Sequence, residues 1–367
     1  MKSKKKTRVL VAMSGGVDSS VAALLMKKKG YDVIGVFMKN WSDTKNDLGE
    51  CRWKDDRKEA MKVASKLKIP LITVDFEKEY RKQVVDEMFR LYKNGITPNP
   101  DVDCNNKVKF PLLWRAAKKL DAEFVVTGHY ARIKKTNGKY SLLRAKDESK
   151  DQSYFLYRLS REDLKHSMFP IGDYTKKEIR EIARKNGFEN FNRKSTVGIC
   201  FIGKVNLKTF LQKKIKPKKG KILDSEGKVI GTHDGIYYYT IGQRIGPRFG
   251  IEVNRGNEKQ LRRWYVAKKN LKKNEIVAAP EGNEINFKKE FLIKSAYWIN
   301  QKPKNKEIVL SRIRQVGELL RSKLSFNGGK IKVILDKPIT GVSEGQAVVL
   351  YKKDVCIGGG VISFSSS

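Results

Sequence analysis

The chain has 367 residues, of which 40% are apolar and 10% aromatic, so it is long enough for two or three domains with buried cores. It carries 78 Lys and Arg against 40 Asp and Glu, and its net charge of +38 favours binding to a polyanion, above all a nucleic acid. No apolar run approaches the roughly 20 residues of a membrane span, so an integral membrane protein is excluded. Lys far outnumbers Arg, a bias that an AT-rich genome also produces, and both origins of the charge stay open.

The first 200 residues alternate short apolar runs with stretches of helical spacing. Such an alternation is typical of a parallel sheet with helices on both faces. Strands are expected at 8–13, 32–38, 70–76 and 123–130, and helices at 19–30, 55–68, 78–95, 110–120 and 175–187.

The pattern changes after about residue 205. Residues 204–221 contain eight Lys and no acidic residue, which fits either a linker or an edge that faces RNA. Short strand-like runs with Gly and Pro between them follow and dominate the C-terminal third, as in an antiparallel sheet or small barrel. The sequence therefore predicts an α/β protein with a doubly wound parallel sheet (1–205), a small central β-rich domain (206–274) and a C-terminal antiparallel β-barrel (275–367).

The string AMSGGVDSS at 12–20 lies between the first expected strand and helix. Gly15 and Gly16 let successive backbone N–H groups point at an anion, and the N-terminus of the helix adds positive potential. The serine hydroxyls can donate to phosphate oxygens, and Asp18 can orient the loop or hold Mg²⁺. The loop lacks the GxxxxGK[ST] pattern of a Walker A motif. It resembles the SGGxDS pyrophosphate loop of the N-type ATP pyrophosphatases.

The four cysteines are Cys51, Cys104, Cys200 and Cys356, and none forms a CxxC pair. A zinc ribbon or another four-thiolate metal site is therefore not expected, and four cysteines are too few for a disulfide scaffold. We expect a reducing compartment, the cytoplasm, because the N-terminal residues show no hydrophobic signal core. Neither haem, flavin, zinc nor an iron–sulfur cluster is expected, and the only metal expected is Mg²⁺ bound to ATP.

Six short motifs occur in the order found in one family. They are SGGVDSS, TPNPDVDCN, TGHYA, KDQSYFL, GICFIG and YTIGQR, at 14–20, 97–105, 127–131, 150–156, 198–203 and 239–244. With them the sequence resembles, over nearly its whole length, the tRNA-specific 2-thiouridylases, which install sulfur on the wobble uridine (position 34) of tRNA. The fold and chemistry of that family are therefore expected here.

The resemblance implies a two-step reaction. Uracil O2 attacks the α-phosphorus of ATP, pyrophosphate leaves, and AMP is then displaced by sulfur at C2. Cys200 would carry the incoming sulfur as a persulfide, and Cys104 would be the nucleophile that frees that sulfur or attacks C2, leaving a Cys104–Cys200 disulfide. A thiolate is the reactive form, and Lys107, Lys109 and Lys194 are candidates for the field that favours it.

The resemblance also implies contacts at individual positions. The target base would be surrounded by Asn99, Pro100 and Asp101, with Asp101 polarising the uracil. The expected ATP contacts are Ala12, Met13, Ser14, Gly15, Gly16, Val17, Asp18, Ser19, Met38 and Gly128. The expected tRNA contacts are His129, Lys150, Asp151, Gln152, Arg312, Ile313 and Gln346, with Arg314 in the same SRIRQ stretch.

The chain departs from the family at one position. An acidic residue usually precedes the stretch around the persulfide cysteine, and here Ser195 stands there. Cys51 and Cys356 are interpreted as non-catalytic. The expected partners are tRNAs for Lys, Glu and Gln and a persulfide sulfur carrier or cysteine desulfurase, with a monomer as the default.

Two alternatives remain. One is another adenylating enzyme of the same fold, of the amidotransferase synthetase type, which would not need two cysteines. The other is a catalytically silent RNA-binding relative, against which the intact loop at 14–20 argues.

Overall fold

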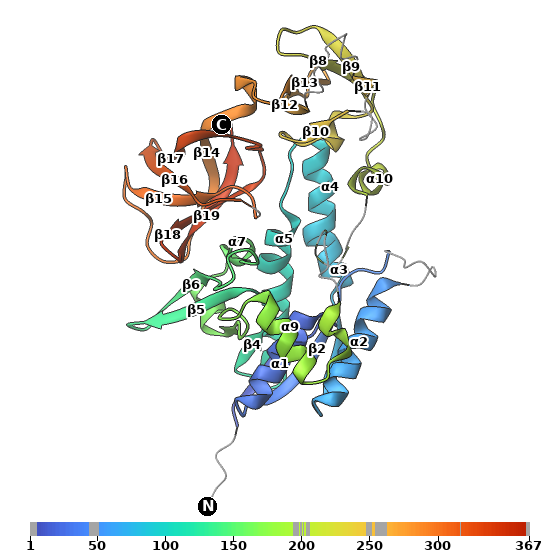
Figure 1. Cartoon of the computed structure of the whole chain (residues 1–367), viewed down its shortest axis with the longest axis vertical. Coiled ribbons are helices and arrows are strands. Elements are labelled where there is room, and N and C mark those ends of the chain that lie inside the picture. Colours follow the sequence, from blue (N-terminus) through green and yellow to red (C-terminus); the bar gives the residue numbers. More distant parts are fainter. Residues whose placement is uncertain are drawn as a thin grey trace, which may run out of the picture.

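The computed structural model describes residues 6–43, 51–193, 198, 200, 202, 206–246, 252–253, 263–315 and 317–364. Figure 1 shows three bodies: an α/β domain at the lower end, a β-barrel at the upper left and a smaller sheet at the top. The helices α4 and α5 stand between the lower domain and the two upper ones. The predicted α/β class and the order of the three architectures are confirmed.

Five parallel strands form the first sheet, in the order β3-β2-β1-β4-β7. Alternate residues of the central strand point to opposite faces, so Val9 and Val11 pack against α1, α2 and α9, whereas Leu10 packs against α6. The strands are β1 Arg8–Ala12, β2 Asp32–Lys39, β3 Leu71–Asp75, β4 Phe124–Val126 and β7 Ser167–Met168. The covering helices are α1 Val17–Lys28, α2 Arg52–Lys66, α6 Phe110–Lys119 and α9 Lys176–Lys185.

Two long helical stretches each contain a π-helical turn, in which the backbone hydrogen bond spans five residues. The first runs through α3 Glu77–Tyr80, the π-turn η1 Arg81–Val85 and α4 Asp86–Lys93. The second runs through α5 Pro100–Asp103, the π-turn η2 Cys104–Lys109 and α6. Pro100 lies in the first turn of α5, where its missing N–H is not needed, and the Asn99 side chain accepts from Val102 N at 3.3 Å.

The central domain is a six-stranded sheet in the order β10-β12-β13-β8-β9-β11. Its strands are β8 Gly220–Leu223, β9 Val229–His233, β10 Arg244–Ile245, β11 Glu252–Val253, β12 Trp264–Asn270 and β13 Glu275–Pro280. The sequence-based boundary after residue 274 separates β12 from β13, yet these two strands pair. We propose that the central domain therefore extends to Pro280. Not every run of β-branched and aromatic residues here is a strand, since IYYYTIG at 236–242 contains the short 3-10 helix η4 Ile236–Tyr238.

The C-terminal domain is a closed barrel, because β14 pairs with both β17 and β19. Its strands are β14 Phe287–Trp298, β15 Ile308–Arg312, β16 Leu320–Asn327, β17 Lys330–Thr340, β18 Ala347–Lys352 and β19 Val355–Ser363. A hairpin of the first domain, β5 Ala131–Thr136 and β6 Lys139–Arg144, extends the barrel sheet through the pairing of β6 with β19. The first domain and the barrel therefore share a sheet.

The remaining helical segments are α7 Ser153–Leu156, α8 Arg161–Lys165, η3 Glu189–Asn192, α10 Leu207–Gln212 and η6 Glu284–Asn286. Among the described residues, none of the helices combines the length and apolar character that crossing a membrane requires.

Candidate active site

The loop between β1 and α1 is held in one shape by its own hydroxyl groups. Ser19 Oγ donates to Gly16 O at 3.0 Å and accepts from Ser14 N at 3.1 Å, and Ser20 Oγ also donates to Gly16 O. Gly15 has a φ of 76°, and a Cβ there would lie 2.2 Å from Asp56 O, so only glycine fits. The loop thus precedes the N-terminus of a twelve-residue helix, a geometry suited to a phosphate group.

Asp18 of this loop is bound by two side chains that the sequence did not single out. Lys176 Nζ contacts its two carboxylate oxygens at 2.6 and 2.7 Å, and Tyr130 OH donates to it at 2.8 Å. Burial raises the pKa of Tyr130, so its hydroxyl stays a donor. Lys176 is the first residue of α9. The capping box of this helix, Thr175 and Glu178, can be recognised in the sequence, but the pairing of Lys176 with Asp18 cannot.

A second pair of side chains clamps the loop from η3 and the residue that follows it. Asn190 Nδ2 donates to Gly15 O and to Ser20 Oγ, both at 2.9 Å. Arg193 donates to Gly15 O at 3.1 Å and pairs with Asp56 at 2.6 Å. No sequence signal pointed to either residue. Arg193 thus holds the phosphate loop from a position seven residues before Cys200 in the chain.

Two other predicted ATP contacts lie at the carboxyl ends of strands next to β1. Gly128 follows β4 so closely against the loop that a Cβ there would lie 2.7 Å from Ser19 N and 2.8 Å from the Asp18 carbonyl carbon. Met38 lies near the end of β2 with only 6% of its surface exposed, packed in the core on the α6 side of the sheet.

Gly128→Ala is expected to weaken ATP binding by about tenfold or more. The added Cβ would push the loop backbone out of place, and a strain of about 1.4 kcal/mol corresponds to a tenfold loss of affinity. Gly317→Ala is the control, since its Cβ would only reach ordinary contact, 3.4 Å from Arg314 O. Isothermal titration with ATP and Mg²⁺ measures both. Equal affinities for the two variants would contradict the placement of ATP at this loop.

The structure brings together the two cysteines of the separate motifs. Cys104 opens the π-turn η2 and is fully buried, whereas Cys200 is partly buried. Their sulfur atoms lie 3.7 Å apart, although 96 residues separate them in the chain. Both are free thiols, and a disulfide between them would need the two sulfur atoms to approach to about 2.05 Å.

Three side chains fix the position of Cys200. Its backbone N–H donates to Asp101 Oδ1 at 2.8 Å, and Tyr80 OH donates to its carbonyl oxygen. Lys109 Nζ lies 3.8 Å from its sulfur. Of the other two lysines considered from the sequence, Lys107 pairs with Asp103 at 2.9 Å and residue 194, like Ser195, lies outside the described residues.

The pKa values of the two thiols are shifted in opposite directions. Burial raises the pKa of Cys104 well above its usual value, and its contact with Cys200 adds to this. The hydrogen bond from Cys104 lowers the pKa of Cys200 against the effect of burial, and Lys109 lowers it further. Burial also raises the pKa of Asp101. Of the two thiols, Cys200 therefore gives up its proton more readily than Cys104.

A pocket of about 350 Å³ opens between the first domain and the barrel. Asn99, Pro100 and Asp101 line it from one side, and Gln346 faces them from the barrel. Gln346 Nε2 donates to Thr97 O and Pro98 O at 3.0 and 2.8 Å, which joins the barrel to the wall of the pocket. The other lining residues are Met88, Tyr92, Pro98, Tyr154, Phe155, Gly198, Leu207, Arg314 and Gln315. The volume suits a ligand of nucleotide size.

Models of three protein families match consecutive parts of the chain. They are described as a tRNA methyl transferase HUP domain (7–204), a tRNA methyl transferase PRC-barrel domain (208–280) and an aminomethyltransferase beta-barrel domain (288–362). The tRNA-specific 2-thiouridylase MnmA 1 of Geobacillus kaustophilus is 44% identical over 98% of this chain and 96% of its own. The chain belongs to the tRNA-specific 2-thiouridylase family.

A second 2-thiouridylase, from Bacillus cytotoxicus, is 42% identical over 97% of this chain and 95% of its own. The solved structures that the chain resembles include distant ones. A 4-thiouridine synthetase in complex with RNA and ATP covers 56% of this chain and 50% of its own, with 17% identity and a TM-score of 0.35, too low to support an argument. Members of the 2-thiouridylase family are enzymes that modify tRNA with sulfur.

Two of the residues expected to contact tRNA meet each other in this 2-thiouridylase family member. Arg312 and Asp151 form an ion pair of 2.6 Å with side-chain exposures of 5% and 0%. Asp151 also accepts from Ala145 N and from the Ser153 hydroxyl. The pair joins the first domain to the barrel, so the two side chains face the interface between domains.

The other residues expected to contact tRNA differ in how exposed they are. Lys150 is exposed, whereas Ile313 is 4% exposed and packs in the barrel core. Gln152 accepts from Tyr130 N at 2.9 Å. His129 is buried, bonded to Thr127 Oγ1 at 2.7 Å, and burial lowers its pKa well below the usual value, so it is neutral.

Asp151→Asn is expected to destabilise the protein by about 3 to 5 kcal/mol, because it leaves the Arg312 charge buried without its partner. Thermal unfolding followed by circular dichroism measures the loss. Lys150→Ala is the control, since that neighbouring side chain is exposed and should change stability by less than about 0.5 kcal/mol. Equal melting temperatures for the two variants would contradict a structural role of the pair.

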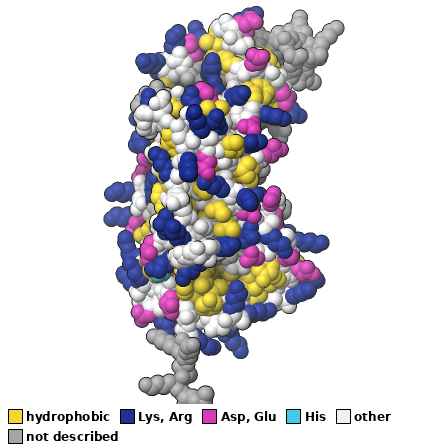
Figure 2. All heavy atoms as spheres, turned by 90° about the vertical axis from the view of Figure 1, so that its left-hand side faces the viewer, with side chains coloured by type: hydrophobic (Ala, Val, Ile, Leu, Met, Phe, Trp, Pro, Cys, Tyr) yellow, Lys and Arg dark blue, Asp and Glu magenta, His cyan; other side chains and the backbone are white. Residues whose placement is uncertain are grey.

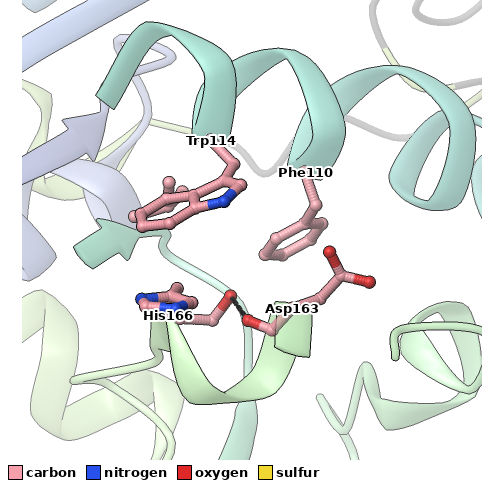
Figure 3. A pocket seen from close by; sticks show the side chains of 6 residues that line it. Phe110, Trp114, Asp163 and His166 are labelled. Carbon is pink, nitrogen blue, oxygen red and sulfur yellow. Dashed lines mark hydrogen bonds between the residues drawn. The ribbon is translucent and has the colours of Figure 1, made fainter. Parts of the chain in front are cut away.

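A second hollow lies between α6 and α8, beside the rings of Trp114 and His166 (Figure 3). The two rings stack with centroids 4.1 Å apart, and the space beside them is about 10 Å³, enough for about one water molecule. This hollow is too small for a substrate. Within the described ranges, no group of three His, Cys, Asp or Glu side chains is arranged to hold a metal ion.

Proposed function

We propose that this protein uses ATP to place sulfur on C2 of the wobble uridine of tRNA, with tRNAs for Lys, Glu and Gln as substrates. The observation that carries the proposal is the pair of thiols 3.7 Å apart, in the same domain as the phosphate loop. Asp101 links this pair to the pocket, because it contacts Cys200 and also lines the cavity. An enzyme that transferred nitrogen would not need two such thiols.

The first half of the proposed reaction activates the base. ATP with its Mg²⁺ binds at the loop from Ala12 to Ser19, where Ser14 is exposed and the following helix N-terminus faces the phosphates. The uracil lies in the pocket beside Asn99, Pro100 and Asp101. Its O2 attacks the α-phosphorus, the bond to the β,γ-pyrophosphate breaks, and C2 becomes reactive because AMP is a good leaving group.

The second half transfers sulfur. The terminal sulfur of a Cys200 persulfide attacks C2, and AMP leaves with the former O2. The Cys104 thiolate then attacks Cys200 Sγ, the Sγ–S bond breaks with its electron pair on the sulfur now bound to C2, and a Cys104–Cys200 disulfide forms. An external dithiol reduces the disulfide. The lowered pKa of Cys200 suits a thiol that accepts sulfur as a thiolate, whereas Cys104, whose pKa is raised, gives up its proton as it attacks.

Mass spectrometry of nucleosides tests the proposal. Purified protein, ATP, Mg²⁺ and a low-molecular-weight persulfide are incubated with unmodified tRNA for Lys, and the product is digested. We expect 2-thiouridine only when ATP is present and only in tRNAs with uridine at position 34. A tRNA with cytidine at that position is the control, and absence of 2-thiouridine from every tRNA would contradict the proposal.

We also propose that Lys216, Lys218 and Lys219, which follow α10, bind tRNA phosphates. All three are exposed, whereas the neighbouring Lys214 pairs with Asp86 at 2.7 Å. Lys and Arg are spread over the barrel side of the molecule rather than gathered in one patch, as Figure 2 shows, so charge alone does not locate the contact. Replacing the three by Gln is expected to reduce the slope of log affinity against log salt by about two, at 0.7 to 0.9 per contact.

The matched control replaces Lys28, Lys29 and Lys68 by Gln, three exposed residues at or just after the C-terminal ends of α1 and α2. These ends lie at the edge of the sheet away from the phosphate loop. Filter binding of tRNA at several salt concentrations measures both triple variants. If both lower the slope equally, the lysines after α10 contribute only to the general charge.

A further inference from the structure

The π-turn η2 has a consequence for the side chains at its two ends. Cys104 and Lys109 are five residues apart, and in a regular α-helix that spacing turns the second side chain about 140° away from the first. In η2 the backbone hydrogen bond spans five residues, so the two ends lie nearly above one another. As a result, Cys104 Sγ lies 3.7 Å and Lys109 Nζ 3.8 Å from the same atom, Cys200 Sγ.

The groups around Cys200 come from three segments. Cys104 and Lys109 belong to η2, Asp101 to α5, and Tyr80 to the end of α3. The carboxylate of Asp101 accepts the backbone N–H of Cys200, and Tyr80 donates to the backbone carbonyl, so both bind main-chain atoms. Among the described residues, the cation that reaches the sulfur itself is Lys109.

Lys109 is protonated at this position. Burial alone lowers its pKa, but Cys200, Cys104 and Asp101 outweigh that effect, and the net pKa is raised. Lys107, two residues earlier, is directed to Asp103 at 2.9 Å instead. The π-turn therefore selects one of the two lysines of the CNNKVK segment for the thiols.

We propose that Lys109 is a catalytic residue whose ammonium group keeps the Cys200 sulfur anionic while that sulfur accepts sulfur from the donor. This rests on the proposed function, in which Cys200 carries the persulfide. The Cys200 thiolate attacks the outer sulfur of a donor persulfide R–S–SH, a new Sγ–S bond forms, and the donor S–S bond breaks with its electron pair on R–S⁻. The leaving thiolate takes up a proton, and no electron acceptor is needed.

The test measures the alkylation rate of Cys200 by iodoacetamide between pH 5 and about 10, with the modified peptide identified by mass spectrometry. Lys109→Met keeps the length of the side chain and removes its charge. We expect the pH of half-maximal rate to rise by about one unit, equal to a tenfold smaller thiolate fraction near neutral pH. The rate at pH 7 falls only about threefold, because the thiolate of a weaker acid is more nucleophilic.

Lys107→Met is the matched control and should keep the wild-type pH profile. The gain of one sulfur atom by Cys200 after exposure to a persulfide donor should slow in Lys109→Met alone. The proposal would be overturned if the alkylation rate of Cys200 in Lys109→Met kept the wild-type midpoint pH. It would also be overturned if that rate fell by the same factor at every pH, because changed access to the sulfur lowers the rate equally at all pH values. Formation of 2-thiouridine by Cys200→Ser, measured separately, would instead overturn the assignment of the persulfide to Cys200, and absence of 2-thiouridine with the wild-type protein would overturn the proposed function.

Discussion

Cys104→Ser and Cys200→Ser are each expected to reduce 2-thiouridine formation by a factor on the order of a thousand or more, the scale of losing a catalytic nucleophile. Serine keeps the volume of the side chain but can carry neither a persulfide nor a disulfide. The sulfur atoms lie 3.7 Å apart, so loss of either one breaks the same transfer. Nucleoside mass spectrometry under single-turnover conditions measures the product.

The matched controls are the two other cysteines. Cys51→Ser should retain thiolation, because this residue lies at the start of α2 and outside the thiol pair. Cys356 is fully buried in β19, so it is replaced by Ala, which avoids burying a hydroxyl group. Near-normal 2-thiouridine from Cys200→Ser would contradict the persulfide assignment.

Asp18→Ala is expected to reduce tRNA-dependent pyrophosphate release by about a hundredfold or more, the scale of losing a preorganised electrostatic group. The carboxylate holds Lys176 and Tyr130 against the phosphate loop, so its loss removes two loop contacts and leaves a cation unpaired. Asp173→Ala is the control, since that carboxylate is 76% exposed and its contact with Arg132, at 4.0 Å, is weak. Pyrophosphate release is followed with a coupled phosphate assay.

The same assay separates activation from sulfur transfer. Cys200→Ser is expected to release pyrophosphate without forming 2-thiouridine, because the phosphate loop and Asp18 do not contact the sulfur in the described structure. If Asp18→Ala and Cys200→Ser lose pyrophosphate release equally, the division into two steps is wrong.

The sequence predicted the elements of the first domain because their periodicity is local. The strand expected at 32–38 is β2 Asp32–Lys39, and the helix expected at 175–187 is α9 Lys176–Lys185. The strand β13 Glu275–Pro280 looks like a barrel strand in the sequence, whereas its pairing with β12 and β8 places it in the central sheet. Strand pairing joins residues far apart in the chain, so the hydrophobic pattern of a single strand does not indicate its partner.

In the site, too, local features could be predicted from the sequence and contacts between distant segments could not. The phosphate loop could be recognised because its chemistry lies within nine consecutive residues. The partners of that loop could not, since Lys176, Asn190 and Arg193 come from segments about 160 to 180 residues away. The choice of Lys109 over Lys107 depended on a π-turn, which residue propensities do not indicate.

A single turnover without reductant tests the central claim most directly. Protein carrying one persulfide at Cys200 is mixed with ATP, Mg²⁺ and substrate tRNA, and both 2-thiouridine and the Cys104–Cys200 disulfide are counted by mass spectrometry. The account predicts about one 2-thiouridine and one disulfide for each persulfide consumed, since one sulfur atom leaves as the two thiols join. Formation of 2-thiouridine while Cys104 stays a free thiol would contradict it.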